Sequence, residues 1–402
     1  MKKVIPAICV VATALTISAA TPDFGRMVDN LAAKIDGVKT ESATLSADKA
    51  ALKAEVAPAD PEVEFEYLWP SSAGELNRWS AGVSQELPDF RKMAATRRVV
   101  RSIDTLDILV RSVSRTEAVY EAEQRLITLI GAHRELAMLR EIHRNLDSLT
   151  VAYTRAWEKG EVNILDLNKI KIEHARASAA DDEAGGKVAA LTAEIITLSG
   201  GTISADDLAQ LDDYPMYQLP TDGHGCSDKE GMMEGVVRRS PQARMLTARE
   251  AVLDSKIDLA SKNRFPRLTL GYVHAYEDGT HFNGLSAGLS LPVFSRKSTV
   301  EAAVCEAYAE KSANEQKLNA MIAEANAACA RAHTLAKLLS KMGPAVGNSN
   351  NERLLRMALD GGEITLLQYL QELSYFVEAG REYEASRLEY ALILSSLARW
   401  SE

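Results

Sequence analysis

Gly160-Glu161-Val162-Asn163-Ile164-Leu165-Asp166 returns 202 residues later as Gly362-Glu363-Ile364-Thr365-Leu366-Leu367-Gln368. Earlier in the chain, Ser80-Ala81-Gly82-Val83-Ser84 returns 206 residues later as Ser286-Ala287-Gly288-Leu289-Ser290. The two echoes keep their order and nearly the same offset. A period of about half the chain indicates duplication of one large unit rather than a solenoid of short repeats.

The composition allows one large core or two ordinary domains. The chain has 402 residues, of which 46% are apolar and 25% charged. Aromatic residues make up only 6%, while Ala, Leu and Glu are plentiful, which is typical of long packed helices. The net charge of -10 argues against a nucleic-acid surface, and we find no dense Lys/Arg block to oppose that conclusion.

Residues 1–20 are predicted to form a signal peptide. Lys2 and Lys3 precede an apolar run, and Ser18-Ala19-Ala20 supplies the small residues of a cleavage site near Thr21. The alternative, a membrane anchor, is disfavoured because the run is shorter than the ~20 residues that span a bilayer. No apolar stretch of that length follows, so we expect an exported protein without a transmembrane helix. Three cysteines remain after cleavage, namely Cys226, Cys305 and Cys329. The sequence predicts no disulfide framework among them.

Each half contains two segments in which apolar and polar residues alternate, as in strands with one apolar face. In the first half they span residues 62–69 and 79–87, and in the second half residues 267–276 and 284–291. Pro88 and Pro292 close the second strand of each pair. The sequence therefore predicts one β-hairpin in each half.

A very long helix follows each hairpin. Residues 92–159 lack proline, contain only Gly131 as a glycine, and show coiled-coil spacing of apolar residues. At 1.5 Å per residue such a helix measures about 100 Å. A return helix is expected over 163–199, after the turn at Gly160. The second half repeats this plan with a helix over 297–360, broken at 343–350 near Gly343-Pro344, and a return helix over 364–400. The domain prediction is thus a first repeat at 21–205, a linker at 206–229 and a second repeat at 230–402.

The strands have the pattern of an outer-membrane barrel, with apolar residues outside, small or polar residues inside, and aromatic residues near the strand ends. Four strands are too few to enclose a pore, whereas three chains would supply twelve, so strand counting predicts a trimer. The alternative is a small soluble sheet on the helices, which leaves the long helices unexplained. The residues expected to face lipid are Tyr67, Trp69, Trp79, Val83, Leu270, Tyr272 and Leu289.

The whole layout resembles the outer membrane efflux protein family, the TolC-like exit ducts. In that family a helix ends in a pattern like Tyr-x-x-Gly-x-x-x-x-x-Asp-Val-Leu at each helical turn. The corresponding segments here run from Trp157 to Leu167 and from Leu359 to Tyr369. The resemblance implies an α+β membrane protein with two repeats, four strands per chain, and a twelve-stranded barrel and helical tunnel made by a homotrimer in the outer membrane lipid. It also implies docking to a periplasmic adaptor and an inner-membrane pump of the RND or ABC type.

The same resemblance places adaptor contacts and a gate at the two turns. The residues concerned are Gly160, Glu161, Asp166, Gly362, Glu363, Gln368 and Gln371. Family members carry carboxylates just after the second turn, where this chain has Gln368 and Gln371, so the acidic gate of the family is not reproduced there. A proline before the second turn is common in the heavy-metal (CusC/CzcC-like) branch, and Pro344 stands in that place. The cargo is left open, because the pump selects it.

We find no nucleophile motif, phosphate-binding glycine loop or metal-ligand cluster, so we expect neither an enzyme nor a cofactor. His133 is interpreted as a packed residue of a helix seam, and His224-x-Cys226 with Met232-Met233 as part of a linker rather than a soft-metal site. His274 and His281 are expected to be solvated. Two rival functions remain: the exit duct of a type I protein secretion system, and a secreted coiled-coil scaffold without a channel.

Overall fold

The computed structural model describes residues 22–35, 38–69, 77–216, 232–262, 266–277, 279–291, 296–346 and 351–400. The expected signal peptide and the His224-x-Cys226 segment lie outside these residues. The chain divides into two compact units, and each draws segments from both halves of the sequence. Unit 1 comprises residues 1–36, 114–240 and 321–402, and unit 2 comprises residues 37–113 and 241–320.

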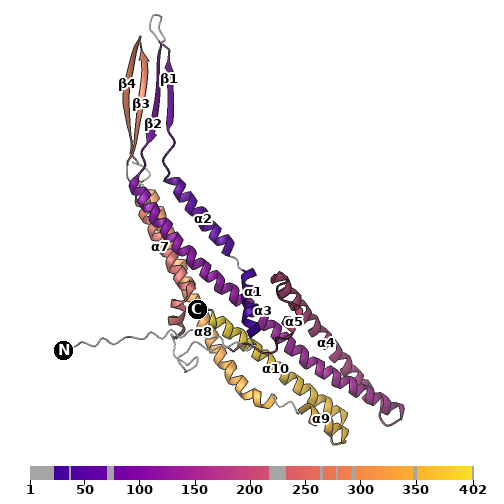
Figure 1. Cartoon of the computed structure of the whole chain (residues 1–402). Helices are drawn as coiled ribbons and strands as arrows, with labels where there is room; N and C mark the ends of the chain where they lie inside the picture. The colour runs from indigo at the N-terminus through magenta and orange to yellow at the C-terminus, as the bar shows by residue number, and fades with distance from the viewer. Residues whose placement is uncertain are drawn as a thin grey trace, which may run out of the picture. The chain divides into compact units, whose positions relative to one another are not determined.

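Unit 2 contains a four-stranded antiparallel sheet and the helices that adjoin it (Figure 1). The strands are β1 (Glu62–Leu68), β2 (Arg78–Glu86), β3 (Arg267–Glu277) and β4 (Thr280–Ser290), hydrogen-bonded in chain order. β2 pairs with β3, with Val83 opposite Tyr272, so the hairpins of the two sequence halves form one sheet. β4 begins at Thr280 rather than near residue 284, because Gly279, with φ of 80°, turns the chain tightly after β3.

The helices of unit 2 are α2 (Val38–Glu55), α7 (Pro241–Lys262) and the first parts of α3 (Phe90–Glu158) and α8 (Arg296–Val346). Three of them, α2, α3 and α7, share one apolar seam. Val99 and Ile103 of α3 are buried against Val252 and Leu259 of α7, with Leu45 and Leu52 of α2 beside them. The seam residues recur every three or four positions, as the coiled-coil spacing predicts.

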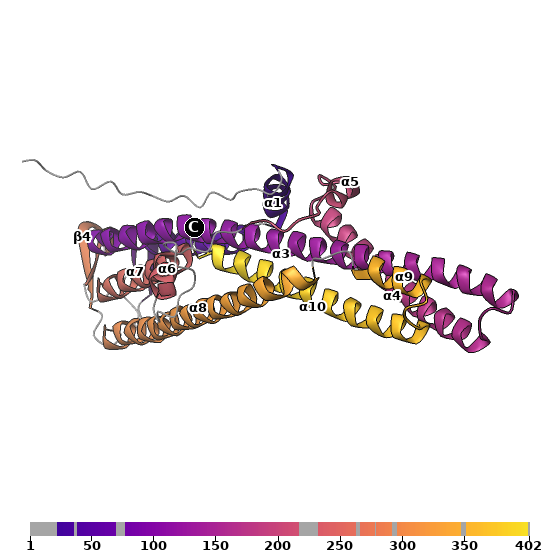
Figure 2. The same cartoon turned by 90° about the horizontal axis from the view of Figure 1, so that it is seen from below.

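Unit 1 contains the remaining parts of α3 and α8, and α1 (Pro22–Ile35), α4 (Ile164–Leu198), α5 (Ala205–Ala209), α6 (Met232–Arg239), α9 (Asn351–Asp360) and α10 (Leu366–Ala398). α4 runs back alongside α3 after the first turn (Figure 2). The largest core gathers Leu31 of α1, Leu126 and Ile130 of α3, and Ile195 of α4. α8 contains Pro344 and ends at Val346, so the helix continues past the proline.

The predicted fold class is confirmed: long helical hairpins accompany a four-stranded sheet built from two β-hairpins. The prediction that the chain has no disulfide is wrong, because Cys329 is disulfide-bonded. Cys305 is free and exposed. Within the described part of the chain, no helix is both long and apolar enough to cross a membrane.

Candidate functional site

The first helical turn is built by backbone hydrogen bonds around Gly160. Gly160 has φ of 77°, a conformation in which a Cβ atom is strained. Its N–H donates to the Trp157 carbonyl at 2.9 Å, and the Glu161 N–H donates to the Ala156 carbonyl at 2.8 Å. These bonds satisfy carbonyls that the end of α3 leaves open. The Asn163 side chain then accepts from the Leu165 N–H at 3.1 Å and caps α4.

The second turn repeats this geometry. Gly362 has φ of 73° and donates to the Leu359 carbonyl at 3.1 Å, and the Glu363 N–H donates to the Ala358 carbonyl at 2.9 Å. Thr365 caps α10 in a full capping box, because its side chain accepts from the Gln368 N–H while Gln368 Oε1 accepts from the Thr365 N–H. The side chain of Gln368 is therefore held by the cap. Gln371 lies outside the capping box and is exposed.

The two turns share one apolar core, so the helical hairpins α3–α4 and α9–α10 lie side by side at this end of unit 1 (Figures 1 and 2). Leu149 of α3 and Ile170 of α4 contact the same cluster as Leu366 and Tyr369 of α10. Tyr369 is only 1% exposed. The sequence predicted each turn separately, and the structure brings them together.

Charged groups connect the two turns around Tyr153. Burial raises the pKa of the Tyr153 phenol, and the negative charges of Asp166 and Asp360 raise it further, although the positive charge of Arg356 opposes them. Asp166 is half-buried and accepts from Lys169 at 3.1 Å, and Arg356 pairs with Asp360 at 3.3 Å. Sequence reasoning missed Tyr153, Arg356 and Asp360, although the four-residue spacing of the last two signals an ion pair on a helix.

The outer surface of the turns carries matched apolar and acidic side chains. Leu165 and Leu367 stand at equivalent places in the sequence repeat and are 62% and 51% exposed. Glu161 and Glu363, also equivalent, are both exposed.

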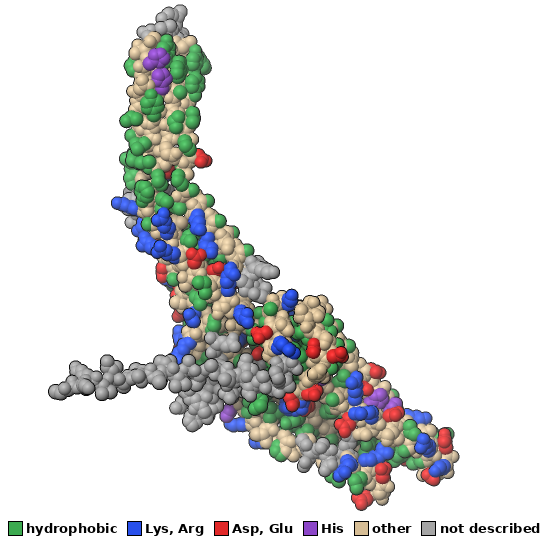
Figure 3. Space-filling model, in the orientation of Figure 1, with side chains coloured by type: hydrophobic (Ala, Val, Ile, Leu, Met, Phe, Trp, Pro, Cys, Tyr) green, Lys and Arg blue, Asp and Glu red, His purple; other side chains and the backbone are tan. Residues whose placement is uncertain are grey.

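One face of the sheet is apolar and uncovered in the single chain. Alternation places Val63 and Phe65 on this face with Leu285, and these side chains are 76%, 67% and 91% exposed. Of the residues predicted to face lipid, Trp79 is half-buried in ring contacts with Phe65, His274 and Tyr276, and Trp69 follows the last residue of β1. The others lie exposed on the strands of this face, namely Tyr67, Val83, Leu270, Tyr272 and Leu289. Apolar side chains gather over the strands in Figure 3.

The opposite face is small and polar. It carries Ser84, Gly271 and Ser286 in register across three strands, and three glutamates of β1, Glu62, Glu64 and Glu66. A Cβ atom on Gly271 would stand 2.5 Å from Ser286 Oγ and 2.8 Å from the Val83 carbonyl oxygen. The sheet thus separates an apolar surface from a polar one, as the alternation predicts.

His274 and His281 lie among the aromatic residues of the apolar face, and they bond to each other rather than only to water. His281 Nδ1 lies 3.2 Å from His274 Nε2, and His274 Nδ1 lies 2.8 Å from Asn283 Oδ1. Asn283 Oδ1 also accepts from the Tyr272 hydroxyl at 2.6 Å. A polar cluster at the strand ends suits the edge of an apolar band.

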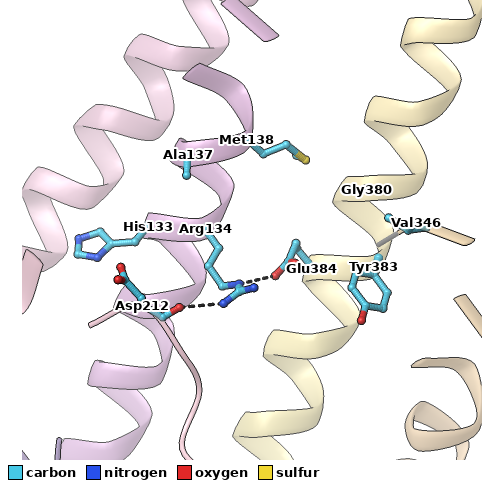
Figure 4. A pocket seen from close by; sticks show the side chains of 9 residues that line it. All are labelled: His133, Arg134, Ala137, Met138, Asp212, Val346, Gly380, Tyr383 and Glu384. Carbon is cyan, nitrogen blue, oxygen red and sulfur yellow. Dashed lines mark hydrogen bonds and ion pairs between the residues drawn. The ribbon is translucent and has the colours of Figure 1, made fainter. Parts of the chain in front are cut away.

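A cavity of about 370 Å³ in unit 1 is lined by residues of α3 and α10 and by Asp212 and Val346 (Figure 4). His133 lines it, and Arg134 bonds Glu384 at 2.9 Å and Asp213 at 2.8 Å. These ion pairs already occupy the Arg134 guanidinium. Among the described residues, no group of three or more His, Cys, Asp and Glu side chains is arranged to hold a metal ion.

No family model and no curated protein matches the chain. Several solved structures do match over nearly its whole length. A membrane protein from Pseudomonas aeruginosa superposes with a TM-score of 0.75 at 16% identity, over 95% of this chain and 91% of its own. The CmeC outer membrane channel of Campylobacter jejuni gives 0.74 at 13% identity, over 94% and 85%. The open MtrE outer membrane channel of Neisseria gonorrhoeae gives 0.70 at 13% identity, over 94% and 89%. The chain therefore shares the fold of these proteins.

Proposed function

We propose that this protein, which has the fold of outer-membrane efflux channels, is the exit duct of a tripartite efflux pump in the outer membrane of a Gram-negative bacterium. One observation carries the proposal: the same chain has an uncovered apolar sheet face and two matched helical turns. A duct needs a wall in lipid and a periplasmic end that meets its partner, and it needs no catalytic group.

The sheet supports assembly into a closed barrel. β1 and β4 are its edge strands, and within the described part of a single chain no further strand pairs with their outer backbone groups. Open edges are unfavourable in lipid, where unpaired N–H and C=O groups lack water. Pairing β4 of one copy with β1 of the next satisfies both edges. Three copies then give a barrel of twelve strands, with the glutamate-bearing face toward the lumen and the apolar face toward lipid.

The turns support adaptor docking and gating. We assign the contacts to Gly160, Glu161, Gly362 and Glu363 with their exposed neighbours Leu165 and Leu367. Asp166 and Glu363 supply the carboxylates of the gate, because Gln368 and Gln371 are neutral. The pump, of RND or ABC type, selects the cargo.

The first test is electrical. The purified protein should migrate as a heat-modifiable trimer and conduct ions across planar bilayers. A soluble monomer without conductance would exclude the duct and favour the scaffold alternative.

The second test separates docking from folding. Gly160→Pro and Gly362→Pro should each abolish export from cells that contain the adaptor and pump, while the trimer still inserts in the membrane. Gly200→Pro is the matched control, since Gly200 also has positive φ, 63°, and donates to the Thr197 carbonyl in a turn far along the sequence from both tips. Export that survives in both tip variants would contradict the assignment.

A further inference from the structure

The start of α3 is strongly basic in an acidic chain. Residues 90–101 contain Arg91, Lys92, Arg97, Arg98 and Arg101 and no Asp or Glu, whereas the whole chain has a net charge of -10. These residues directly follow β2, which ends at Glu86. The positive charge is therefore concentrated where a strand passes into a helix.

The same sign recurs at one more junction of sheet and helix. Lys262 ends α7 and Arg267 begins β3. Basic side chains thus stand between the sheet and the helices at two places that are distant in sequence. We call Arg91, Lys92, Arg97, Arg98, Arg101, Lys262 and Arg267 the basic collar.

Acidic neighbours neutralise only part of the basic collar. Lys92 pairs with Glu55 at 2.8 Å, and Arg267 lies 3.6 Å from Glu86. Asp258 alone serves both Arg98 and Lys262, at 2.8 and 2.9 Å. Arg97 and Arg101 are exposed, and neither forms an ion pair with any residue that the structure describes. Their four-residue spacing sets two like charges side by side, which costs helix stability unless an external anion is present.

The basic collar lies where it would meet a lipid surface. In Figure 3, Lys and Arg side chains gather over the helices next to the sheet, on the face that also displays the apolar side chains of the strands. A basic zone bordering an apolar band attracts anionic headgroups, with a free energy that corresponds to roughly fivefold in affinity per charge. We propose that the basic collar binds the phosphate groups of anionic phospholipids at the membrane surface adjoining the helices. This rests on the proposed function, because it requires the sheet to lie in a bilayer.

The experiment compares lipid retention. The full chain is reconstituted in bilayers of phosphatidylcholine mixed with phosphatidylglycerol and extracted in mild detergent, and the retained lipids are quantified by mass spectrometry. Arg97→Gln/Arg101→Gln removes the two unpaired charges, and Gln preserves helix propensity. Lys337→Gln/Lys341→Gln is the matched control, since these exposed α8 residues of unit 1 have the same spacing and likewise lack an ion pair in the described structure.

We expect the wild type and the lysine variant to enrich phosphatidylglycerol equally, and the arginine variant to lose roughly 25-fold in that preference. High salt should reduce the enrichment by screening. Equal enrichment in all three proteins would overturn the proposal. An arginine variant that loses enrichment no more than the lysine variant would overturn it as well. Conductance of the arginine variant in pure phosphatidylcholine tests the duct separately, so the two proposals fail independently.

Discussion

Leu388 of α10 packs closely against Gly131 of α3. A Cβ atom on Gly131 would stand 2.9 Å from Leu388 Cδ2 and 3.2 Å from the Tyr214 hydroxyl. Gly131 is the only glycine in the 69-residue helix α3. A glycine inside a helix costs about 1 kcal/mol relative to alanine. The close approach of α10 explains why the helix tolerates that cost here.

Gly131→Ala should therefore destabilise unit 1 by about 1–2 kcal/mol, because overpacking outweighs the gain in helix propensity. Urea unfolding in detergent measures the change. Gly185→Ala is the control, since nothing lies within 4 Å of a Cβ atom there, and it should stabilise by up to about 1 kcal/mol. A stabilised Gly131→Ala protein would show that α10 does not pack against this position.

The contribution of the α10 cap to stability should be measurable separately from that of the turn before it. Thr365→Ala removes the hydrogen bonds of the Thr365 hydroxyl to the Gln368 N–H and to Gln368 Oε1 but keeps the bond from the Thr365 N–H. We expect a loss of about 1 kcal/mol together with faster amide exchange in the first turn of α10. Thr365→Ser keeps the hydroxyl and should behave like the wild type. If alanine and serine give the same exchange rates, the capping box does not hold Gln368 in place.

Tyr214 should titrate abnormally. Burial and the charge of Glu384 raise its pKa to about 12, against an opposing effect of Arg134 and Arg387. The pKa of Tyr214 is higher in the folded state than in the unfolded state, so the neutral phenol stabilises the folded state. This contribution to the free energy of unfolding is complete below pH 10, the ordinary pKa of tyrosine, and is lost as the pH rises toward 12. The difference in tyrosinate absorbance between wild type and Tyr214→Phe follows this group alone.

Tyr214→Phe should itself be nearly neutral or slightly stabilising at pH 7. The Tyr214 hydroxyl is buried and has no hydrogen-bond partner among the residues that the structure describes, so its removal relieves a desolvation cost. The ring that Arg134 and Arg387 cover, at 5.7 and 5.4 Å, is retained. A loss above about 1 kcal/mol would reveal a partner for the hydroxyl.

The polar face of the sheet should reject a side chain at Gly271. Gly271→Ala forces contact with the Val83 backbone oxygen, which cannot move without breaking the ladder, so we expect a lower yield of heat-resistant trimer. Gly284→Ala lies on the same face with open space around it and should assemble normally. Trimer yield on unheated gels compares the two variants, and equal yields would contradict the close approach of β2 and β4 to Gly271.

Local chemistry made much of this protein predictable. Alternation in β1 to β4 follows from the two-residue period of a strand, and the turns follow from Gly160 and Gly362, since glycine adopts positive φ most easily. The repeated motifs identified the duplication for the same reason: like residues at like spacing form like turns. Leu165, Leu367 and the residues of the apolar sheet face could therefore be placed by counting along the chain.

Only the tertiary structure decided which elements meet. Nothing local pairs Leu149 with Tyr369 or Gly131 with Leu388, because these contacts depend on how distant helices pack. The basic collar escaped a search for a continuous Lys/Arg block, since small and apolar residues separate the five basic residues at the start of α3, and Lys262 and Arg267 lie elsewhere in the sequence. Sequence alone determined the periodic elements and their turns, whose causes act within a few residues. The sharing of one core by both turns arose from long-range burial of apolar surface, which a single strand or helix cannot specify.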